Sequence, residues 1–222
     1  MSYHLIVGAE LKQDMARMHA AWKQGSNSPA GREFQAAMDA MRALREGRES
    51  EYEGKQLGSG PSSYDLRDAA QLKVPVFREY TDRGRPLGPS HRLIYREFEP
   101  LPKVEDGRVV PDPNAQAYRH AVAFVHRGDD PAAVAGRRLG RERGRLQPEL
   151  HGLAGGGRPS VGPDRREGIQ TTPHRIPVPP DLIRQAAILR DSPPPTARPP
   201  AGPPTASGPR PTNPGQARER DR

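Results

Sequence analysis

The eleven aromatic residues of this 222-residue chain all lie between Tyr3 and Phe124. The prolines are distributed the other way, with 10 in residues 1–144 and 17 in residues 145–222. A chain needs large apolar side chains to bury enough surface to offset the conformational entropy that folding removes. The sequence therefore predicts a globular domain at 1–144 and a disordered tail, rich in Pro, Gly and Arg, at 145–222.

One stretch of the tail differs from the rest in composition. Residues 180–190 place Leu182, Ala186 and Leu189 at helical spacing. About three helical turns are only marginally stable alone in water. We therefore expect either a transient helix without a partner or a docking segment that folds on one.

The first 47 residues predict a strand followed by two helices. Residues 3–7 are apolar and partly β-branched, as is typical of a strand. Spacing at i, i+4, i+7 and i+11 predicts a helix that contains Leu11, Met15, Met18 and Trp22. Ser28 followed by Pro29 predicts the N-cap and first position of a second helix, which Gly47 ends.

The following segments predict mainly strands. We expect strands at 72–76, 91–98 and 118–125, a loop at 54–63, and a short final helix from Pro131. Helices first and consecutive strands afterwards indicate an α+β domain. The predicted fold is an N-terminal strand and a helical hairpin packed on a small antiparallel β-sheet.

Alternation along the two clearest strands predicts which side chains share a face. Leu93 and Tyr95 are expected on one face of the sheet. In the other strand, Val122 and Phe124 are expected to point the same way.

Several classes of protein are excluded by composition. The chain has no Cys, so it has no disulfides, no Cys-ligated zinc and no thiol nucleophile. Apolar runs of at most five residues predict no membrane span, and no signal peptide is visible at the N-terminus. We expect a cytoplasmic protein with no metal site and no cofactor.

The net charge of +8 favours polyanionic partners such as nucleic acid or the ribosome. Thirty of the 35 basic residues are Arg. A GC-rich coding sequence is the alternative explanation for that preference.

Basic residues that can contact a phosphate fall in four clusters. The clusters contain Lys55, Arg67, His91 with Arg92 and Arg96, and His126 with Arg127. Arg92 and Arg96 are four residues apart in a predicted strand, so they share a face. His126 and Arg127 come where the last long strand ends, so their side chains can reach both solvent and a ligand.

These clusters resemble motifs of the RelE/ParE superfamily of type II toxins. His91-Arg92-Leu93-Ile94-Tyr95 is similar to an arginine-containing strand of RelE and YoeB toxins. Residues 121–127 resemble the family's apolar strand that ends in a basic pair, and residues 3–44 resemble its opening strand and hairpin. The resemblance extends over residues 3–140 and leaves out the tail.

The resemblance implies a toxin that cleaves mRNA on the ribosome without a metal ion, or a ParE-like inhibitor of DNA gyrase. It also implies a cognate antitoxin as a partner. Arg92 matches the family's phosphate-binding arginine, and His126 and Arg127 match its strand-end basic position, which makes these three the candidate catalytic residues. Candidate nucleic-acid contacts are Lys55, Arg67, His91 and Arg96.

The sequence departs from the family pattern at two places. Residues 128–133 contain no aromatic residue where many of the nucleases carry a Tyr. The loop between Val76 and His91 is also longer than is usual in the family. A non-catalytic nucleic-acid-binding protein, an inactive toxin-like protein and a degenerate gene product therefore remain alternatives.

Overall fold

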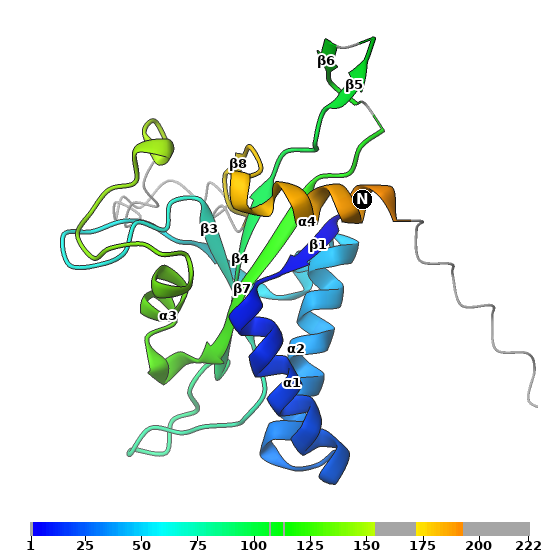
Figure 1. The fold of residues 1–222 in the computed structure, drawn as a ribbon. Coiled ribbons are helices and arrows are strands. Elements are labelled where there is room, and N and C mark those ends of the chain that lie inside the picture. The colour runs from blue at the N-terminus through cyan, green and yellow to red at the C-terminus, as the bar shows by residue number, and fades with distance from the viewer. Residues whose placement is uncertain (1, 107, 113, 154–171, 193–222) are drawn as a thin grey trace, which may run out of the picture. The chain divides into compact units, whose positions relative to one another are not determined.

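The computed structural model describes residues 2–106, 108–112, 114–153 and 172–192 (Figure 1). The helices are α1 (Ala9–Gln24), α2 (Pro29–Glu46), α3 (Pro131–Arg138) and α4 (Pro180–Asp191). The strands are β1 (His4–Val7), β2 (Glu53–Gln56), β3 (Ala69–Val74), β4 (His91–Phe98), β5 (Lys103–Glu105), β6 (Arg108–Val110), β7 (Tyr118–His126) and β8 (Arg175–Ile176). The α+β class is confirmed.

The main sheet is mixed, where the sequence predicted an antiparallel one. Its strands lie in the order β1-β7-β4-β3-β2, and β8 pairs with the end of β4. β7, β4, β3 and β2 are antiparallel neighbours, whereas β1 runs parallel to β7. A short turn can join only antiparallel neighbours. β1 pairs with β7, which is far away in sequence, so the chain between them is long enough for the two strands to run parallel.

The ends of the second helix are as predicted. The Ser28 hydroxyl accepts a hydrogen bond from the backbone N–H of Gly31 at 3.0 Å, and Pro29 is the first helical residue. Gly47 ends α2 with φ at +70°, in the left-handed region that glycine adopts without steric cost. These local signals act between neighbours in the chain, so the sequence alone is enough to predict them.

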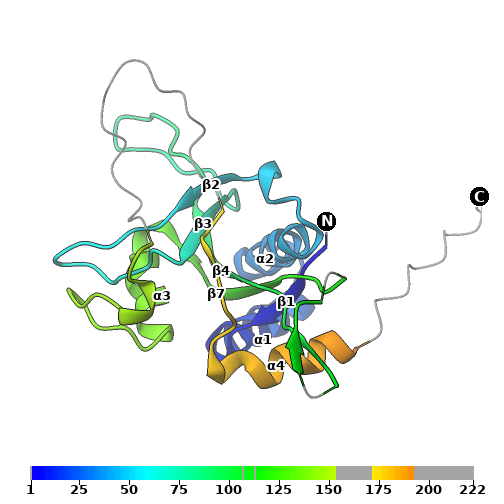
Figure 2. The same cartoon turned by 90° about the horizontal axis from the view of Figure 1, so that it is seen from above.

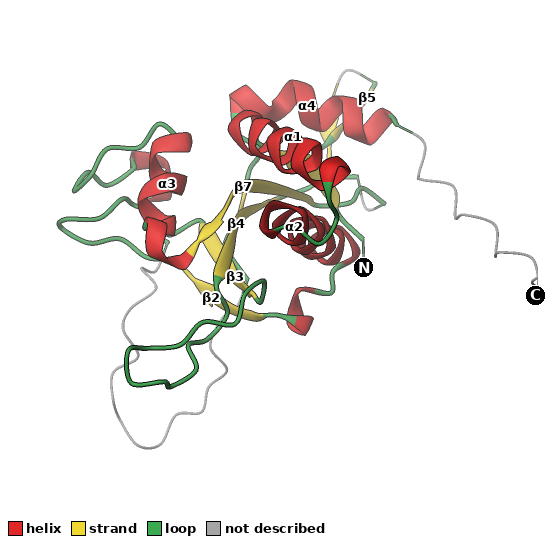
Figure 3. Cartoon of the chain, turned by 90° about the horizontal axis from the view of Figure 1, so that it is seen from below, coloured by secondary structure: helices red, strands yellow, loops and turns green. Residues whose placement is uncertain are grey.

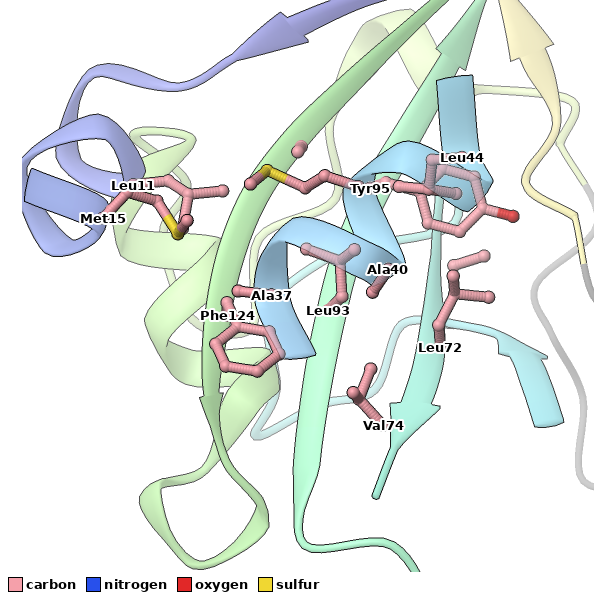
Figure 4. Packing of buried hydrophobic residues seen from close by; sticks show 13 residues of the cluster. Leu11, Met15, Ala37, Ala40, Leu44, Leu72, Val74, Leu93, Tyr95 and Phe124 are labelled. Carbon is pink, nitrogen blue, oxygen red and sulfur yellow. The ribbon is translucent and has the colours of Figure 1, made fainter. Parts of the chain in front are cut away.

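Helices α1 and α2 pack together on one face of the sheet (Figures 2 and 3). Figure 4 shows how their apolar side chains meet those of the strands. The contacts join Leu11 and Leu44 of the helices to Leu72, Leu93 and Tyr95 of the strands. All five side chains are fully buried.

A β-bulge in β7 changes the predicted faces. Ile94 pairs with Ala123 and the next residue of β4 pairs with Ala121, so Val122 is an extra residue in the ladder. Val122 packs with Ile94 on the α3 side of the sheet, while Phe124 packs against the helical hairpin. The prediction that Val122 and Phe124 share a face was wrong, because one inserted residue shifts the alternation.

Helix α4 is packed against the domain. Its Leu182 and Ala186 are buried against Ile6, Phe98 and Tyr118. The compact unit consequently extends to Ser192, beyond the predicted boundary at residue 144. The predicted disorder of 154–171 and 193–222 lies outside the described residues.

A buried network of charges joins β8 to the core. Arg119 donates to both carboxylate oxygens of Glu49 at 2.8 Å and to Glu97 at 3.1 Å. Glu97 also accepts a hydrogen bond from Arg175 of β8 at 2.9 Å. The Arg119 guanidinium lies over the ring of Tyr3, with its carbon 3.6 Å from the ring centroid. The buried positive charge of Arg119 is compensated because its guanidinium N–H groups donate to two carboxylates.

Strand β2 lies where the sequence predicted the start of a loop at 54–63. Lys55 pairs with Gln71, and Glu53 forms an ion pair with Lys73 of β3. β2 is an edge strand, and most of its side chains are not buried. It therefore lacks the alternation of apolar and polar residues by which strands are identified in a sequence.

Candidate functional site

A pocket of about 560 Å³ opens at the end of the sheet where β4 begins and β7 ends. His91 and His126 are cross-strand partners there, and their rings meet edge to face with centroids 5.3 Å apart. Helices α1, α2 and α3 and the turn after β7 complete the wall. The ionisable residues of the lining are Asp14, Arg17, Glu33, His91, His126, Asp129, Arg137 and Arg138.

The tautomer of His91 is set by Ser90. The Ser90 hydroxyl oxygen accepts hydrogen bonds from the backbone N–H groups of Val76 at 3.2 Å and Phe77 at 2.9 Å, and it lies 3.0 Å from His91 Nδ1. Because both lone pairs of this oxygen are used, its proton is directed at Nδ1. The imidazole proton is therefore on Nε2, which faces Glu33 Oε1 at 3.7 Å.

His91 is buried and neutral near pH 7. Its ring stacks on Phe124 with the centroids 5.1 Å apart. Burial, with a smaller contribution from His126, lowers the pKa of His91 to about 4. Burial also raises the pKa of Glu33 above its usual value. A neutral N–H donor therefore faces a carboxylate that holds a proton more readily than usual, which suits a general base.

Glu79 holds His126 and Arg127 together at the edge of the pocket. His126 Nε2 lies 2.7 Å from one carboxylate oxygen of Glu79, and Arg127 donates to the other. The hydrogen bond with His126 lowers the pKa of Glu79. His126 Nδ1 accepts from the backbone N–H of Gly128 at 3.2 Å, while Arg127 donates to the carbonyl of Gly88 at 2.8 Å. These contacts fix the His126 ring and join the two arms of the loop between β3 and β4.

The three arginines of the pocket differ in their partners. Arg138 donates to the carbonyl of Val122 at 3.1 Å and pairs with Asp14, which also pairs with Arg17. Arg137 is exposed, and its guanidinium makes no hydrogen bond or ion pair within the described part of the chain. Arg137 is therefore available to an anionic ligand.

Arg92, the predicted phosphate-binding residue, lies on the opposite face of the sheet from His91 and His126. It pairs in register with Val125, and successive residues of a strand alternate between faces. Its guanidinium donates to two backbone carbonyls at 2.7 and 2.8 Å. The structure thus places His126 in the pocket lining, joins Arg127 to it through Glu79, and places Arg92 outside the pocket.

Arg96 and Arg67 are buried in ion pairs away from the pocket. Arg96 donates to Asp68 at 2.7 Å, and Arg141 donates to the same carboxylate at 2.7 and 2.6 Å. Arg67 donates to both oxygens of Asp65 at 2.8 Å and to the backbone carbonyl of Leu153 at 3.1 Å. Buried charges of this kind are satisfied by each other, so these two guanidiniums connect segments of the fold.

Lys55 is exposed on the edge strand β2. Two strands, β3 and β4, separate it from β7. The structure therefore places Lys55 across the sheet from the pocket.

Glu33, Glu79 and Arg137 belong to the pocket region but were missed by the sequence analysis. They come from α2, the β3–β4 loop and α3, and no motif connects them. Only the packing of these three elements around the two histidines brings them together. The unusual length of the loop that carries Glu79 was the one signal available.

No helix in the described part of the chain is both long and apolar enough to cross a membrane. Comparisons of the chain with protein-family models, with curated proteins and with solved structures found no match. The geometry of the pocket is therefore the basis on which a function is assigned.

Proposed function

We propose that the protein is a cytoplasmic toxin of the RelE/ParE type, which cleaves mRNA without a metal ion and is neutralised by a cognate antitoxin. The observation that carries this proposal is the cross-strand pair of His91 and His126, which shares a pocket with Glu33 and Arg137. The sequence resemblance over residues 3–140 supplies the substrate class. The pocket supplies a base, an acid and a cation for the chemistry.

A ribonucleotide carries its own nucleophile, so the protein has to move two protons. Glu33 takes the proton of the 2′-hydroxyl as that oxygen forms a bond to the adjacent phosphorus. The bond from phosphorus to the 5′ oxygen of the next nucleotide breaks. In the free protein His126 donates from Nε2 to Glu79 and accepts from Gly128 at Nδ1, so the ring has to leave Gly128 and take up a second proton before it gives one to that oxygen. Arg137 stabilises the added negative charge on phosphorus. The products are a 2′,3′-cyclic phosphate and a free 5′-hydroxyl.

The remaining polar residues position these groups. Glu79 orients the His126 ring, and Arg127 holds Glu79. The His91 N–H lies 3.7 Å from Glu33, which is longer than a hydrogen bond. Catalytic hydrogen bonds often shorten when substrate binds, so His91 is placed to fix the Glu33 carboxylate in the complex.

The test is inducible expression of the full chain in bacteria, with growth and mRNA 5′ ends measured together. Glu33→Gln and His126→Gln keep the side-chain size and remove the base and the acid. Each should reduce cleavage about 100-fold or more. Arg92→Gln is the matched control, because Arg92 lies on the other face of the sheet.

The outcomes separate the alternatives. Growth arrest with new mRNA ends, lost in Glu33→Gln and His126→Gln but kept in Arg92→Gln, supports the proposed site. Loss in Arg92→Gln alone would move the active site to the other face. Arrest without mRNA cleavage would favour a gyrase-type target, and a folded protein that causes no arrest would favour non-catalytic nucleic-acid binding.

A further inference from the structure

The loop at 75–90, between β3 and β4, projects from the end of the sheet at which the pocket opens (Figure 1). Its two arms are hydrogen-bonded to each other. The backbone N–H of Leu87 donates to the carbonyl of Glu79, and that of Thr81 donates to the carbonyl of Arg85, each at 2.8 Å. The loop is therefore a narrow hairpin whose shape is fixed by its own backbone.

Both arms of this hairpin are fastened beside the pocket. One arm is held by Glu79, which contacts His126 and Arg127. The other is held by Gly88, whose carbonyl accepts from Arg127. The base of the hairpin therefore lies next to His126, which lines the pocket.

The hairpin carries cations and an aromatic ring whose side chains make no hydrogen bond, ion pair or ring contact with the rest of the described fold. Arg78, Arg83 and Arg85 are exposed, and their side chains make no ion pair with any described residue. Tyr80 is 59% exposed. Asp82 is the one carboxylate of the hairpin without an ion pair in the described residues, since Glu79 is paired at its base. The hairpin therefore has a net positive charge around an accessible ring.

We propose that this hairpin binds the single-stranded RNA that flanks the cleavage site. Proteins hold single strands by combining cations that follow the phosphates with aromatic rings on which bases stack. Arg78, Arg83 and Arg85 supply the first element and Tyr80 the second. The inference rests on the proposed function, because it extends the substrate of the pocket by several nucleotides.

The charges are tested by binding of a fluorescein-labelled 12-nucleotide single-stranded RNA to the full chain, measured by fluorescence anisotropy at several salt concentrations. For single strands, each phosphate contact contributes about 0.7 to the slope of log affinity against log salt. Arg78→Gln/Arg83→Gln should lower the slope by about 1.4. The control Arg108→Gln/Arg184→Gln removes two exposed charges on β6 and α4, and it should leave the slope unchanged.

The ring is tested in the same assay. Tyr80→Leu should weaken binding about fivefold or more, the loss expected for one stacked base. Tyr80→Phe keeps the ring and should bind like the wild type. Equal effects of the two charge pairs, no effect of Tyr80→Leu, or competition by polyglutamate as strong as by unlabelled RNA would each overturn the proposal.

Cleavage separates this proposal from the proposed function. The hairpin variants should cleave the 12-nucleotide RNA more slowly than wild type and a dinucleotide at the wild-type rate. Wild-type rates on both substrates would overturn the hairpin proposal and leave the nuclease intact. Binding that depends on the hairpin, with no cleavage by the wild-type protein even when the RNA is presented on ribosomes, would support the hairpin and overturn the nuclease.

Discussion

The imidazole of His91 lies edge to face against that of His126, with 5.3 Å between the ring centroids. The register of β4 and β7 fixes this contact. Burial lowers the pKa of His91 to about 4, so His91 adds no charge beside His126 near pH 7. His91 is therefore a neutral N–H donor, and the proposed function gives the proton transfer to His126 alone.

Ser90→Ala should allow the proton of neutral His91 to occupy either ring nitrogen. The substitution removes the hydroxyl proton at Nδ1 and leaves the N–H groups of Val76 and Phe77 without their acceptor. We expect a mixture of His91 tautomers in ¹⁵N NMR spectra, where the wild type shows the proton on Nε2. Stability should fall by about 1–3 kcal/mol. An unchanged His91 spectrum would contradict the assignment of Ser90 as the residue that positions this ring.

Arg119→Met should be among the most destabilising single changes in the sheet. Arg119 is fully buried, and its removal leaves the carboxylates of Glu49 and Glu97 without it. Breaking a buried pair costs about 3–5 kcal/mol, which urea unfolding can measure. Arg42→Met is the control, because the Arg42 ion pair with Asp39 is exposed and should matter by less than about 1 kcal/mol. Equal losses in the two variants would argue against the network.

The protein should lose stability as the pH falls below the ordinary pKa of histidine. Burial lowers the pKa of His91 to about 4 and that of His120 to about 3. The unfolded chain takes up these protons first, near pH 6.5, so the stabilisation is complete above that pH. It is lost progressively as the pH falls from 6.5 to the folded pKa values of about 4 for His91 and about 3 for His120. Thermal unfolding measures this loss, and the melting temperature should fall from pH 7 to pH 5.5 and again to pH 4.5.

His120→Leu isolates one part of this acid sensitivity. The Nδ1 atom of His120 is buried and has no hydrogen-bond partner among the described residues. The leucine variant should match or exceed the wild type at pH 7, by about 1 kcal/mol. Its stability should also fall less between pH 6.5 and 4. An identical pH dependence in both proteins would show that His120 is not buried as a neutral ring.

Two C-terminally truncated proteins test whether α4 belongs to the folded unit. A chain that ends at Ser192 keeps α4 and should unfold at the wild-type temperature. A chain of residues 1–171 uncovers Ile6, Phe98 and Tyr118, and should lose about 3 kcal/mol or more from their exposure. Equal melting temperatures of the two truncated proteins would show that α4 adds nothing to the core.

The sequence alone was enough to predict the helical hairpin, the span of β4 and the α+β class. Helix caps such as Ser28 and stops such as Gly47 act between residues a few positions apart, so they can be read without knowing the fold. It also singled out His91, His126 and Arg127 by their position at strand ends, and the structure places the two histidines in the pocket lining with Arg127 beside them. The role expected for Arg92 could not be judged, since which face a side chain occupies depends on the partner strand.

The tertiary structure decided the rest. Parallel pairing of β1 with β7, the bulge at Val122 and the docking of α4 all join residues far apart in the chain. The candidate site was assembled in the same way, because Glu33 and Arg137 of the pocket lining and Glu79 beside His126 come from three separate elements that meet only in the fold. Local signals set each element, whereas the register between strands and the packing of apolar faces determined which side chains came together.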